Sequence, residues 1–348
     1  MKQTQNGGLA APTKPDEMDL SIIIVNWNSA KFVQNCLPTV YQSAKGIRFE
    51  IIVVDNGSGD GCGEMLGRHF PDVRFISSKE NLGFARANNL AFGYSTGRNI
   101  LFLNPDTEAI GSAIVHLVRF LDSTPDAGVV GARLLNSDHS VQTSCVQRFP
   151  TIVNRLLDSN YLRRLAPRSS VWGIRPLIEN IAGTAAVEVI SGACQMLRRD
   201  VFEQVGFYDP DYFMYAEDVD LCFKARQKGW KNYYVGDAIV IHHGGKSSEA
   251  KSESNFASVM TRESLHKFFA HRRGKVYAAT YRAIIGLSAL FRLGLLASLM
   301  VVTLGRFRRD ALSAAMRRWT RIFRWTIGRE NWVKIISPRK ACGEHSAS

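Results

Sequence analysis

The sequence predicts an α/β fold built on a mostly parallel, Rossmann-like sheet with helices on both faces. From residue 20 onward, short runs of β-branched and aliphatic residues alternate with segments of helical pattern. This alternation is typical of sheets assembled from strand–helix–strand units. Polar residues follow the runs one after another, and ligands of such sheets bind beyond the carboxyl ends of the strands. The same pattern therefore predicts the fold class and the edge of the sheet that holds a site.

Four strands are expected in the first part of the chain. They are the runs at 21–25, 50–54, 73–76 and 99–103. Helical segments are expected at 30–42, after the first strand, and from Gly83 onward, after the third. Strands and helices that take turns in this way favour parallel pairing of the strands.

Polar residues behind these strands form the first candidate site. They are Asn26 and Asn28 after the first strand, Asp55 after the second, and Asn104 and Asp106 after the fourth. Asn and Asp are common turn formers, so a turn explains any one of them taken alone. Their recurrence after successive strands indicates a shared site instead.

The second half of the chain is less regular. Residues 142–188 are interrupted by Arg and Pro and are expected to form an irregular excursion from the sheet. Order returns in a series of elements that comprises a strand at 189–197, helices at 199–205 and 215–229, and two short strands at 232–235 and 238–242. The helix at 215–229 has its carboxylates first, its Lys and Arg later and a Gly at its end, which suits the helix dipole.

All of the excess positive charge lies near the C-terminus. The whole chain has a formal net charge of +13. Residues 262–340 contain 18 Lys and Arg and three acidic residues, a net charge of +15, so the remainder of the chain has −2. Large apolar residues are interleaved with these charges, which is typical of helices that lie in the headgroup layer of a membrane. Membrane contact is therefore favoured over nucleic-acid binding for this region.

The apolar stretch at 283–304 is long enough to span a bilayer. Arg292 lies at its middle, and an Arg there costs roughly 2.5–3.5 kcal/mol on insertion scales. Gly286, Ser288 and Gly294 lower its hydrophobicity further. We expect a surface-lying amphipathic helix or a buried helix rather than a spanning one.

Composition divides the chain into segments. They are a disordered leader at 1–18, the α/β domain at 19–250, a basic and apolar helical region at 251–340 that associates with a membrane, and a tail at 341–348. The leader has no apolar signal-peptide core, so the α/β domain is expected to stay in the cytosol. The six cysteines are scattered without metal-ligand spacing, which predicts buried or incidental thiols in a reducing compartment.

Two groups of residues have the chemistry of a metal site and of a base. Asp106 could hold Mg²⁺ or Mn²⁺ together with phosphate oxygens, although an Asn-Pro-Asp turn also explains it. His242 or His243 could complete that metal site from the other half of the chain. Glu217 and Asp218 follow an aromatic run, and they either cap a helix or supply a general base.

Six motifs, taken in order, resemble the family 2 glycosyltransferases with the GT-A fold. They are Val53-Val-Asp-Asn-Gly-Ser-Gly-Asp-Gly61, Asn81-Leu-Gly-Phe-Ala-Arg-Ala-Asn-Asn89, Leu103-Asn-Pro-Asp-Thr107, Ser191-Gly-Ala-Cys-Gln-Met-Leu-Arg-Arg199, Phe213-Met-Tyr-Ala-Glu-Asp-Val-Asp-Leu-Cys222 and His242-His-Gly-Gly-Lys-Ser247. The resemblance covers about residues 19–248 and is strongest to the rhamnosyltransferase-like branch of bacterial cell-surface polysaccharide synthesis.

On the donor side, the resemblance implies that Asp55 contacts the nucleobase and ribose. Residues 81–89 would cover the nucleotide, from Asn81 onward, with Arg86 near the diphosphate. Asn26, Asn28 and Asn104 would lie in the same donor site.

For the reaction, the resemblance implies that Asp106 is the last acid of a metal-binding motif, in which Asn104 replaces the first Asp of many relatives. His242 would reach the metal or the diphosphate. Asp218 would be the catalytic base, with Glu217 beside it, in an in-line displacement that inverts the anomeric carbon.

The resemblance also implies the substrates. The leading donor is dTDP-rhamnose, and galactose, galactofuranose, glucose and N-acetylglucosamine donors are alternatives. The acceptor would be a saccharide on a polyprenyl diphosphate, reached from the cytoplasmic face of the membrane by a peripheral, basic C-terminal region that is attracted to anionic lipids.

Two other classes of protein fit the sequence less well. A dinucleotide-dependent oxidoreductase would need a GxGxxG turn after the first strand, and the segment Val25-Asn-Trp-Asn-Ser29 has no Gly. A non-catalytic membrane-bound scaffold on the same fold would be expected to lack a motif residue, and none is missing.

Overall fold

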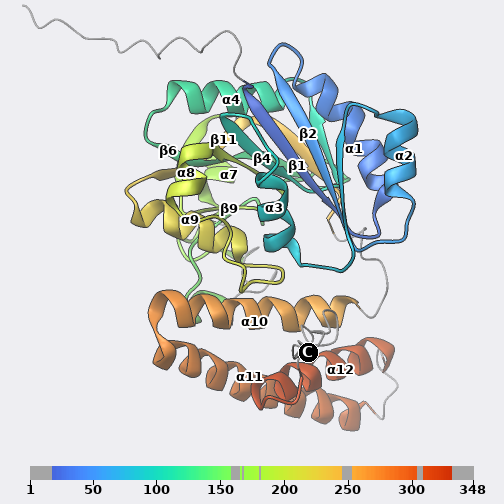
Figure 1. Ribbon diagram of the computed structural model, residues 1–348. Coiled ribbons are helices and arrows are strands. Elements are labelled where there is room, and N and C mark those ends of the chain that lie inside the picture. The colour runs from blue at the N-terminus through green and yellow to red at the C-terminus, as the bar shows by residue number, and fades with distance from the viewer. Residues whose placement is uncertain are drawn as a thin grey trace, which may run out of the picture.

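The computed structural model describes residues 18–157, 165–166, 168–179, 182–244, 253–303 and 309–330, with side chains from 256 onward in the fifth range. The expected leader, apart from Met18, and the expected tail lie outside these residues. In the described part, an α/β body surrounds a nine-stranded sheet, and three long helices lie against one end of the body (Figure 1).

The sheet has the strand order β3-β2-β1-β4-β10-β6-β11-β5, with β8 paired to β11. Its strands are β1 (Leu20–Asn26), β2 (Phe49–Asn56), β3 (Arg74–Ser78), β4 (Asn99–Leu103), β5 (Thr107–Ile110), β6 (Ala127–Leu135), β8 (Thr184–Val187), β10 (Cys194–Arg198) and β11 (Lys231–His242). β1 and β4 are buried along their whole length, because helices cover both faces of the sheet.

The first four strands pair in parallel, as expected. β1 lies between β2 and β4, and its last residue, Asn26, is in register with Asp55. β10 is antiparallel to both β4 and β6, so the sheet is mixed rather than parallel throughout. The prediction of two strands after residue 231 was wrong. β11 is one strand with a register shift between Val235 and Ile239, where it bulges against β6.

The helices of the body pack against the sheet, mostly through apolar side chains. They are α1 (Ala30–Ser43), α2 (Cys62–His69), α3 (Phe84–Phe92), α4 (Ala113–Ser123), α8 (Arg199–Gln204) and α9 (Glu217–Gln227). α1 buries Val33, Cys36, Leu37 and Val40, the spacing of an amphipathic helix. The five described cysteines are buried free thiols, as predicted, and Cys342 lies outside the described residues.

The region at 142–188 contains only short elements among its described residues. They are β7 (Val146–Gln147), α5 (Ile152–Leu156), α7 (Arg175–Glu179) and the strand β8. β7 pairs with β9 (Val189–Ile190) to form a separate two-stranded sheet. The expected strand at 189–197 is thus divided between two sheets, as β9 and β10.

The C-terminal region is helical, as predicted. α10 (Glu253–Arg273) lies against the body. α11 (Lys275–Val302) runs back along α10, and α12 (Arg309–Thr326) packs on α11 (Figure 1). Gly274, with a φ of 91°, allows the reversal between α10 and α11. Of the described helices, α11 alone is long and apolar enough to cross a membrane, and 17% of its most apolar window is buried.

Candidate active site at the carboxyl edge of the sheet

A cavity of about 590 Å³ lies where the parallel strands end, and its size is within the range of small-ligand sites. Residues behind β1, β2 and β4 line one part of it, and the beginning of α9 lines another. α10 closes the cavity with Ala257, Thr261 and Leu265. The cavity therefore has walls from both halves of the chain, as the spacing of polar residues predicted.

One corner of the cavity holds a carboxylate, an amide and an imidazole. Nε2 of His242 lies 3.4 Å from Oδ1 of Asp106 and 3.3 Å from Nδ2 of Asn104. Asp106 is 4% exposed, so its carboxylate faces the cavity rather than bulk solvent. β4 delivers Asn104 and Asp106, and the last residue of β11 is His242.

The orientation of the His242 ring is fixed from behind by Gln142. Nε2 of Gln142 donates to Oδ1 of Asn136 at 3.0 Å, so its Oε1 faces Nδ1 of His242 at 2.8 Å. The proton of the neutral ring then lies on Nδ1, which leaves the lone pair of Nε2 directed at Asp106. His243 is engaged elsewhere, with Glu108 and Ser137 both at 2.8 Å. His242, and not His243, lines the cavity.

Glu217 and Asp218 begin α9 and line the same cavity. Oδ2 of Asp218 accepts from the amide of Gly192 at 2.9 Å, and Oδ1 accepts from the amide of Val219 at 2.8 Å. A Cβ on Gly192 would lie 3.2 Å from the Cβ of Asp218, so glycine there lets the backbone approach the carboxylate closely.

The two carboxylates differ in their hydrogen bonds. Burial raises the pKa of Glu217 well above its usual range, and the negative charge of Asp218 adds to the rise. Oε2 of Glu217 has no hydrogen-bond partner among the described residues. Burial also raises the pKa of Asp218, but the amides of Gly192 and Val219 oppose that rise by donating to the charged form. A proton shared by the pair is therefore expected on Glu217, with Asp218 ionised.

A strained turn delivers this pair to the cavity. Tyr215 and Ala216 have φ values of 67° and 62°, in the left-handed region that residues with a Cβ seldom adopt. Each costs about 1–2 kcal/mol, so contacts from outside the turn must hold it. One of these is a hydrogen bond from Oγ of Ser264, on α10, to the carbonyl of Met214 at 2.7 Å.

Some of the predicted donor-binding residues line the cavity, and others are buried outside its lining or exposed at the surface. Nδ2 of Asn26 donates to Asp55 at 3.0 Å, and neither side chain is among those that line the cavity. Asn81 does line it, and it accepts from Nδ2 of Asn56 at 3.0 Å. Asn28 is exposed, and its backbone amide donates to Ser58.

Arg86 lies apart from this arrangement. Its Nε donates to the carbonyl of Pro210 at 3.0 Å, and Arg86 is not among the residues that line the cavity. The role near a diphosphate that the resemblance implies for Arg86 stays a prediction.

Sequence reasoning missed several residues that line or support the site. Asn56 directly follows Asp55 on the same strand end, so its place in the chain was a usable signal. Gln142 and Arg155 lie in the irregular region, where no pattern distinguishes them from other polar residues.

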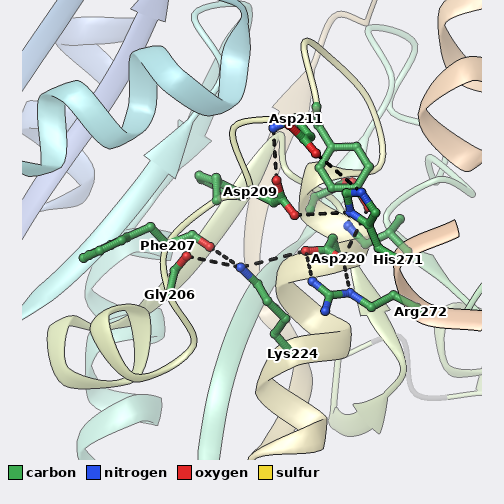
Figure 2. Close-up of polar contacts among 12 residues, drawn as sticks. Gly206, Phe207, Asp209, Asp211, Asp220, Lys224, His271 and Arg272 are labelled. Carbon is green, nitrogen blue, oxygen red and sulfur yellow. Dashed lines mark hydrogen bonds and ion pairs between the residues drawn. The ribbon is translucent and has the colours of Figure 1, made fainter. Parts of the chain in front are cut away.

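Helix α10 is joined to the 209–211 loop and to α9 by a row of polar contacts (Figure 2). Arg272 binds Asp220 through two hydrogen bonds of 2.6 and 2.9 Å, and Asp220 is fully buried. Nζ of Lys267 donates to the carbonyl of Asp211 at 2.7 Å. These contacts fix the helix that closes the cavity onto the turn that presents Glu217 and Asp218.

His271 completes the row. Its Nδ1 and Nε2 lie 3.4 Å from carboxylate oxygens of Asp209 and Asp211, respectively (Figure 2). The three side chains could in principle surround a metal ion. A bridge between α10 and the 209–211 loop explains the same geometry, and the cluster is half exposed and away from the cavity.

Replacement of Arg272 by Leu is expected to lower the free energy of unfolding by about 3 kcal/mol, because the fully buried carboxylate of Asp220 would lose its bidentate partner. Lys224, whose Nζ lies 3.8 Å from Asp220, offsets part of the loss. Urea denaturation of the two proteins measures the difference. Arg273→Leu, at an exposed neighbouring position, is the control, and an equal effect of both changes would contradict this role.

A mixed sheet with a cavity at the ends of its parallel strands is the arrangement of the GT-A glycosyltransferases. The family model described as glycosyl transferase family 2 matches residues 21–206. The chain belongs to this family and is a glycosyltransferase.

Several relatives share more specific names. An N-acetylglucosaminyl-diphospho-decaprenol L-rhamnosyltransferase of Mycobacterium tuberculosis is 30% identical over 244 residues, which cover 67% of this chain and 78% of the relative. The rhamnosyltransferase WbbL of Escherichia coli is 25% identical over 233 residues, which cover 64% of this chain and 82% of WbbL. The resemblance to the rhamnosyltransferase-like branch is thereby confirmed.

A solved mannosyltransferase of Pyrobaculum calidifontis, in complex with GDP-Man and Mn²⁺, has the same fold. It superposes with a TM-score of 0.53 at 16% identity, covering 92% of this chain and 89% of the mannosyltransferase. At this identity the similarity bears on the fold alone, and it agrees with the predicted GT-A architecture.

Proposed function

We propose that the protein is a metal-dependent, inverting glycosyltransferase that transfers L-rhamnose from dTDP-rhamnose to a saccharide carried on a lipid diphosphate. The observation that supports this most directly is that Asp106, His242 and the pair Glu217–Asp218 line the same cavity. One part offers ligands for a divalent cation, and another offers a base for the acceptor hydroxyl.

The corner formed by Asp106 and His242 fits Mg²⁺ or Mn²⁺. Two ligands about 2.1 Å from an octahedral metal, and at right angles, lie roughly 3 Å apart. The distance of 3.4 Å between Oδ1 of Asp106 and Nε2 of His242 is close to that value, and Gln142 already selects the tautomer that can bind a metal. The ion would neutralise the charge that develops on the leaving diphosphate.

Charge in the cavity supports the same proposal. Its described lining contains Asp106, Glu217 and Asp218 but only one Arg or Lys, Arg155. A nucleotide diphosphate would meet repulsion from three carboxyl groups if all of them were ionised. A cation bound at Asp106 and a proton on Glu217 would remove most of that repulsion.

Asp218 has the position of a general base. Its carboxylate lines the cavity, and the amides of Gly192 and Val219 fix its orientation. In the proposed reaction it takes the proton of the acceptor hydroxyl as that oxygen attacks the anomeric carbon from the face opposite the diphosphate. The configuration at that carbon is inverted as a result.

The residues that would read the nucleotide surround the ends of β1 and β2. Asn56 and Asn81 face the cavity and are hydrogen-bonded to each other, and Asn26 is hydrogen-bonded to Asp55 at the same strand ends. The choice of rhamnose rests on the names of the relatives. Galactose, galactofuranose, glucose and N-acetylglucosamine donors are the alternatives.

We assign residues 19–250 to the catalytic domain and 251–340 to a peripheral membrane-associating region at the cytoplasmic face. α11 exposes large apolar side chains to solvent, among them Leu287, Leu290, Phe291 and Leu295, in a region with a strong positive charge. This composition suits an anionic lipid surface.

The proposed function is tested with the full-length protein in detergent, a panel of nucleotide sugars and Mn²⁺ or Mg²⁺. Release of the free nucleoside diphosphate is measured with and without a lipid diphosphate saccharide. Selective, EDTA-sensitive turnover of dTDP-rhamnose is expected. Turnover of another sugar nucleotide would correct the donor, and calorimetry without metal-dependent binding of any donor would refute the function in favour of a scaffold.

The double change Leu290→Glu and Phe291→Glu is expected to lower partition into anionic vesicles by at least about tenfold, because both exposed side chains would otherwise enter the apolar layer. Flotation with vesicles that contain phosphatidylglycerol measures the change. Tyr94→Glu is the control, since Tyr94 is similarly exposed but lies outside the helical region. Equal flotation of all three proteins would exclude α11 as the lipid contact.

A further inference from the structure

A second cavity adjoins the first one. Its volume is about 320 Å³, and α5, α10 and α11 contribute its described lining. Arg155, Ala257, Thr261 and Leu265 line both cavities. The two cavities are therefore adjacent and share these four residues as lining.

The second cavity is basic where the first is acidic. Its described lining includes Arg155 and Arg262 and no Asp or Glu. Tyr281, from α11, lies at the same cavity, and the charges of Arg262 and Arg155 oppose the rise that burial produces in the pKa of Tyr281. The charges of both guanidinium groups thus affect the same hydroxyl, that of Tyr281.

More positive charge gathers behind Arg262. The guanidinium groups of Arg262, Arg292 and Arg318 lie 5.5, 4.6 and 5.8 Å from the ring centre of Trp319. Arg262 therefore lies next to the same ring as two further guanidinium groups, in a region of positive charge. Arginine is also the side chain best suited to bidentate binding of phosphate.

We propose that the second cavity binds the diphosphate of the lipid-linked acceptor, with Arg155 and Arg262 as its ligands. This inference rests on the proposed function. In an acceptor with one sugar, the diphosphate is attached to the same ring that presents the attacking hydroxyl. It must therefore lie within one sugar of the base, in a neighbouring space rather than in the acidic cavity that holds Asp218.

The same geometry gives the lipid chain a path. Tyr281 and Ile285 line the second cavity from α11, and the exposed apolar residues Leu287, Leu290 and Phe291 follow on the same helix. A lipid chain that leaves the diphosphate along α11 would run toward the surface proposed to contact the membrane.

The test uses farnesyl diphosphate as the probe and the full-length protein in detergent with EDTA, so that the metal corner does not contribute to binding. Farnesol, which lacks the diphosphate, is the comparison ligand. Calorimetry of wild-type protein is expected to show binding of farnesyl diphosphate at least about tenfold tighter than that of farnesol. Arg155→Gln and Arg262→Gln are each expected to weaken the diphosphate about tenfold. Arg317→Gln, which removes an exposed charge elsewhere on α12, is expected to leave it unchanged.

Circular dichroism and the midpoint of thermal unfolding of each variant show that the fold is intact, and Arg262→Lys, expected to retain part of the affinity, is a second variant at the same position as Arg262→Gln. Equal binding by wild type and both Gln variants would overturn the proposal. Displacement of the nucleotide sugar by farnesyl diphosphate would place the diphosphate in the donor site and also overturn it. If phosphatidylglycerol vesicles displace bound farnesyl diphosphate as effectively as an excess of the free diphosphate does, the arginines bind bilayer headgroups instead. Failure to bind any nucleotide sugar, with diphosphate binding still dependent on Arg155 and Arg262, would refute the proposed function but not the anion site.

Discussion

Asp218→Asn is expected to lower the rate of sugar transfer by about 10²–10⁴-fold, the usual contribution of a positioned general base. The amide cannot accept the proton of the acceptor hydroxyl, but it keeps the size of the carboxylate. Binding of the nucleotide sugar with Mn²⁺ is expected to stay near the wild-type value, since Asp218 is not among the proposed metal ligands. Product formation and calorimetry measure the two quantities separately.

Glu217→Gln is the matched control. Because burial and the neighbouring charge raise the pKa of Glu217 and so favour its protonated form, a neutral amide in its place is expected to change the rate by no more than about tenfold. If Glu217→Gln were the inactive variant and Asp218→Asn the active one, the assignment of the base would be reversed.

The pH profile provides a separate readout of the same assignment. A base is active when deprotonated, so activity falls as the pH drops through the pKa of Asp218. Burial raises that pKa, so the fall is expected at a higher pH than for an ordinary aspartate. The acid limb should persist in Glu217→Gln and disappear from the residual activity of Asp218→Asn.

His242→Ala is expected to raise the Mn²⁺ concentration needed for half-maximal activity by about 100-fold or more, because a direct ligand is lost. Asp106→Asn should have a similar effect, since it removes the charged ligand. Gln142→Leu should raise the requirement by about 10–100-fold, because it releases the hydrogen bond of 2.8 Å that orients the His242 ring. Titration of EDTA-treated protein with Mn²⁺ gives these values.

His243→Ala serves as the control for the metal prediction. His243 is adjacent in sequence, but its ring contacts Glu108 and Ser137 instead of the cavity. Its loss is expected to leave the Mn²⁺ requirement unchanged. A metal requirement that follows His243 and not His242 would contradict the proposed ligand set.

The strands β1, β2 and β4 could be predicted to within about two residues because they are largely buried and read as continuous apolar runs. The exposed strand β3 was also placed to within about two residues, from its β-branched and aromatic residues alone. The direction of β10 could not be predicted, because a buried strand has the same hydrophobic pattern in a parallel and in an antiparallel pair. Residues 107–135, which form β5, α4 and β6, were not assigned, and β11 was divided at its bulge.

The site was predictable to the extent that it lies at strand ends and a helix start. Asn104, Asp106, His242, Glu217 and Asp218 meet in one cavity, although their roles stay predictions. The contributions of Gln142 and of α10 depend on which segments pack together, and neither has a local sequence signal. For the same reason the carbonyl that binds Arg86 could not be anticipated.

The left-handed turn at Tyr215 and Ala216 has a consequence for how this enzyme can change over time. Its unfavourable backbone is held in part by Ser264, and α10 also fixes the adjoining loop through Lys267 and Arg272. The C-terminal helices and the turn before α9 are therefore expected to have been inherited together. Exchange of residues 251–330 for the tail of another family member would disturb the acids at the start of α9 unless the 209–220 segment were exchanged with them.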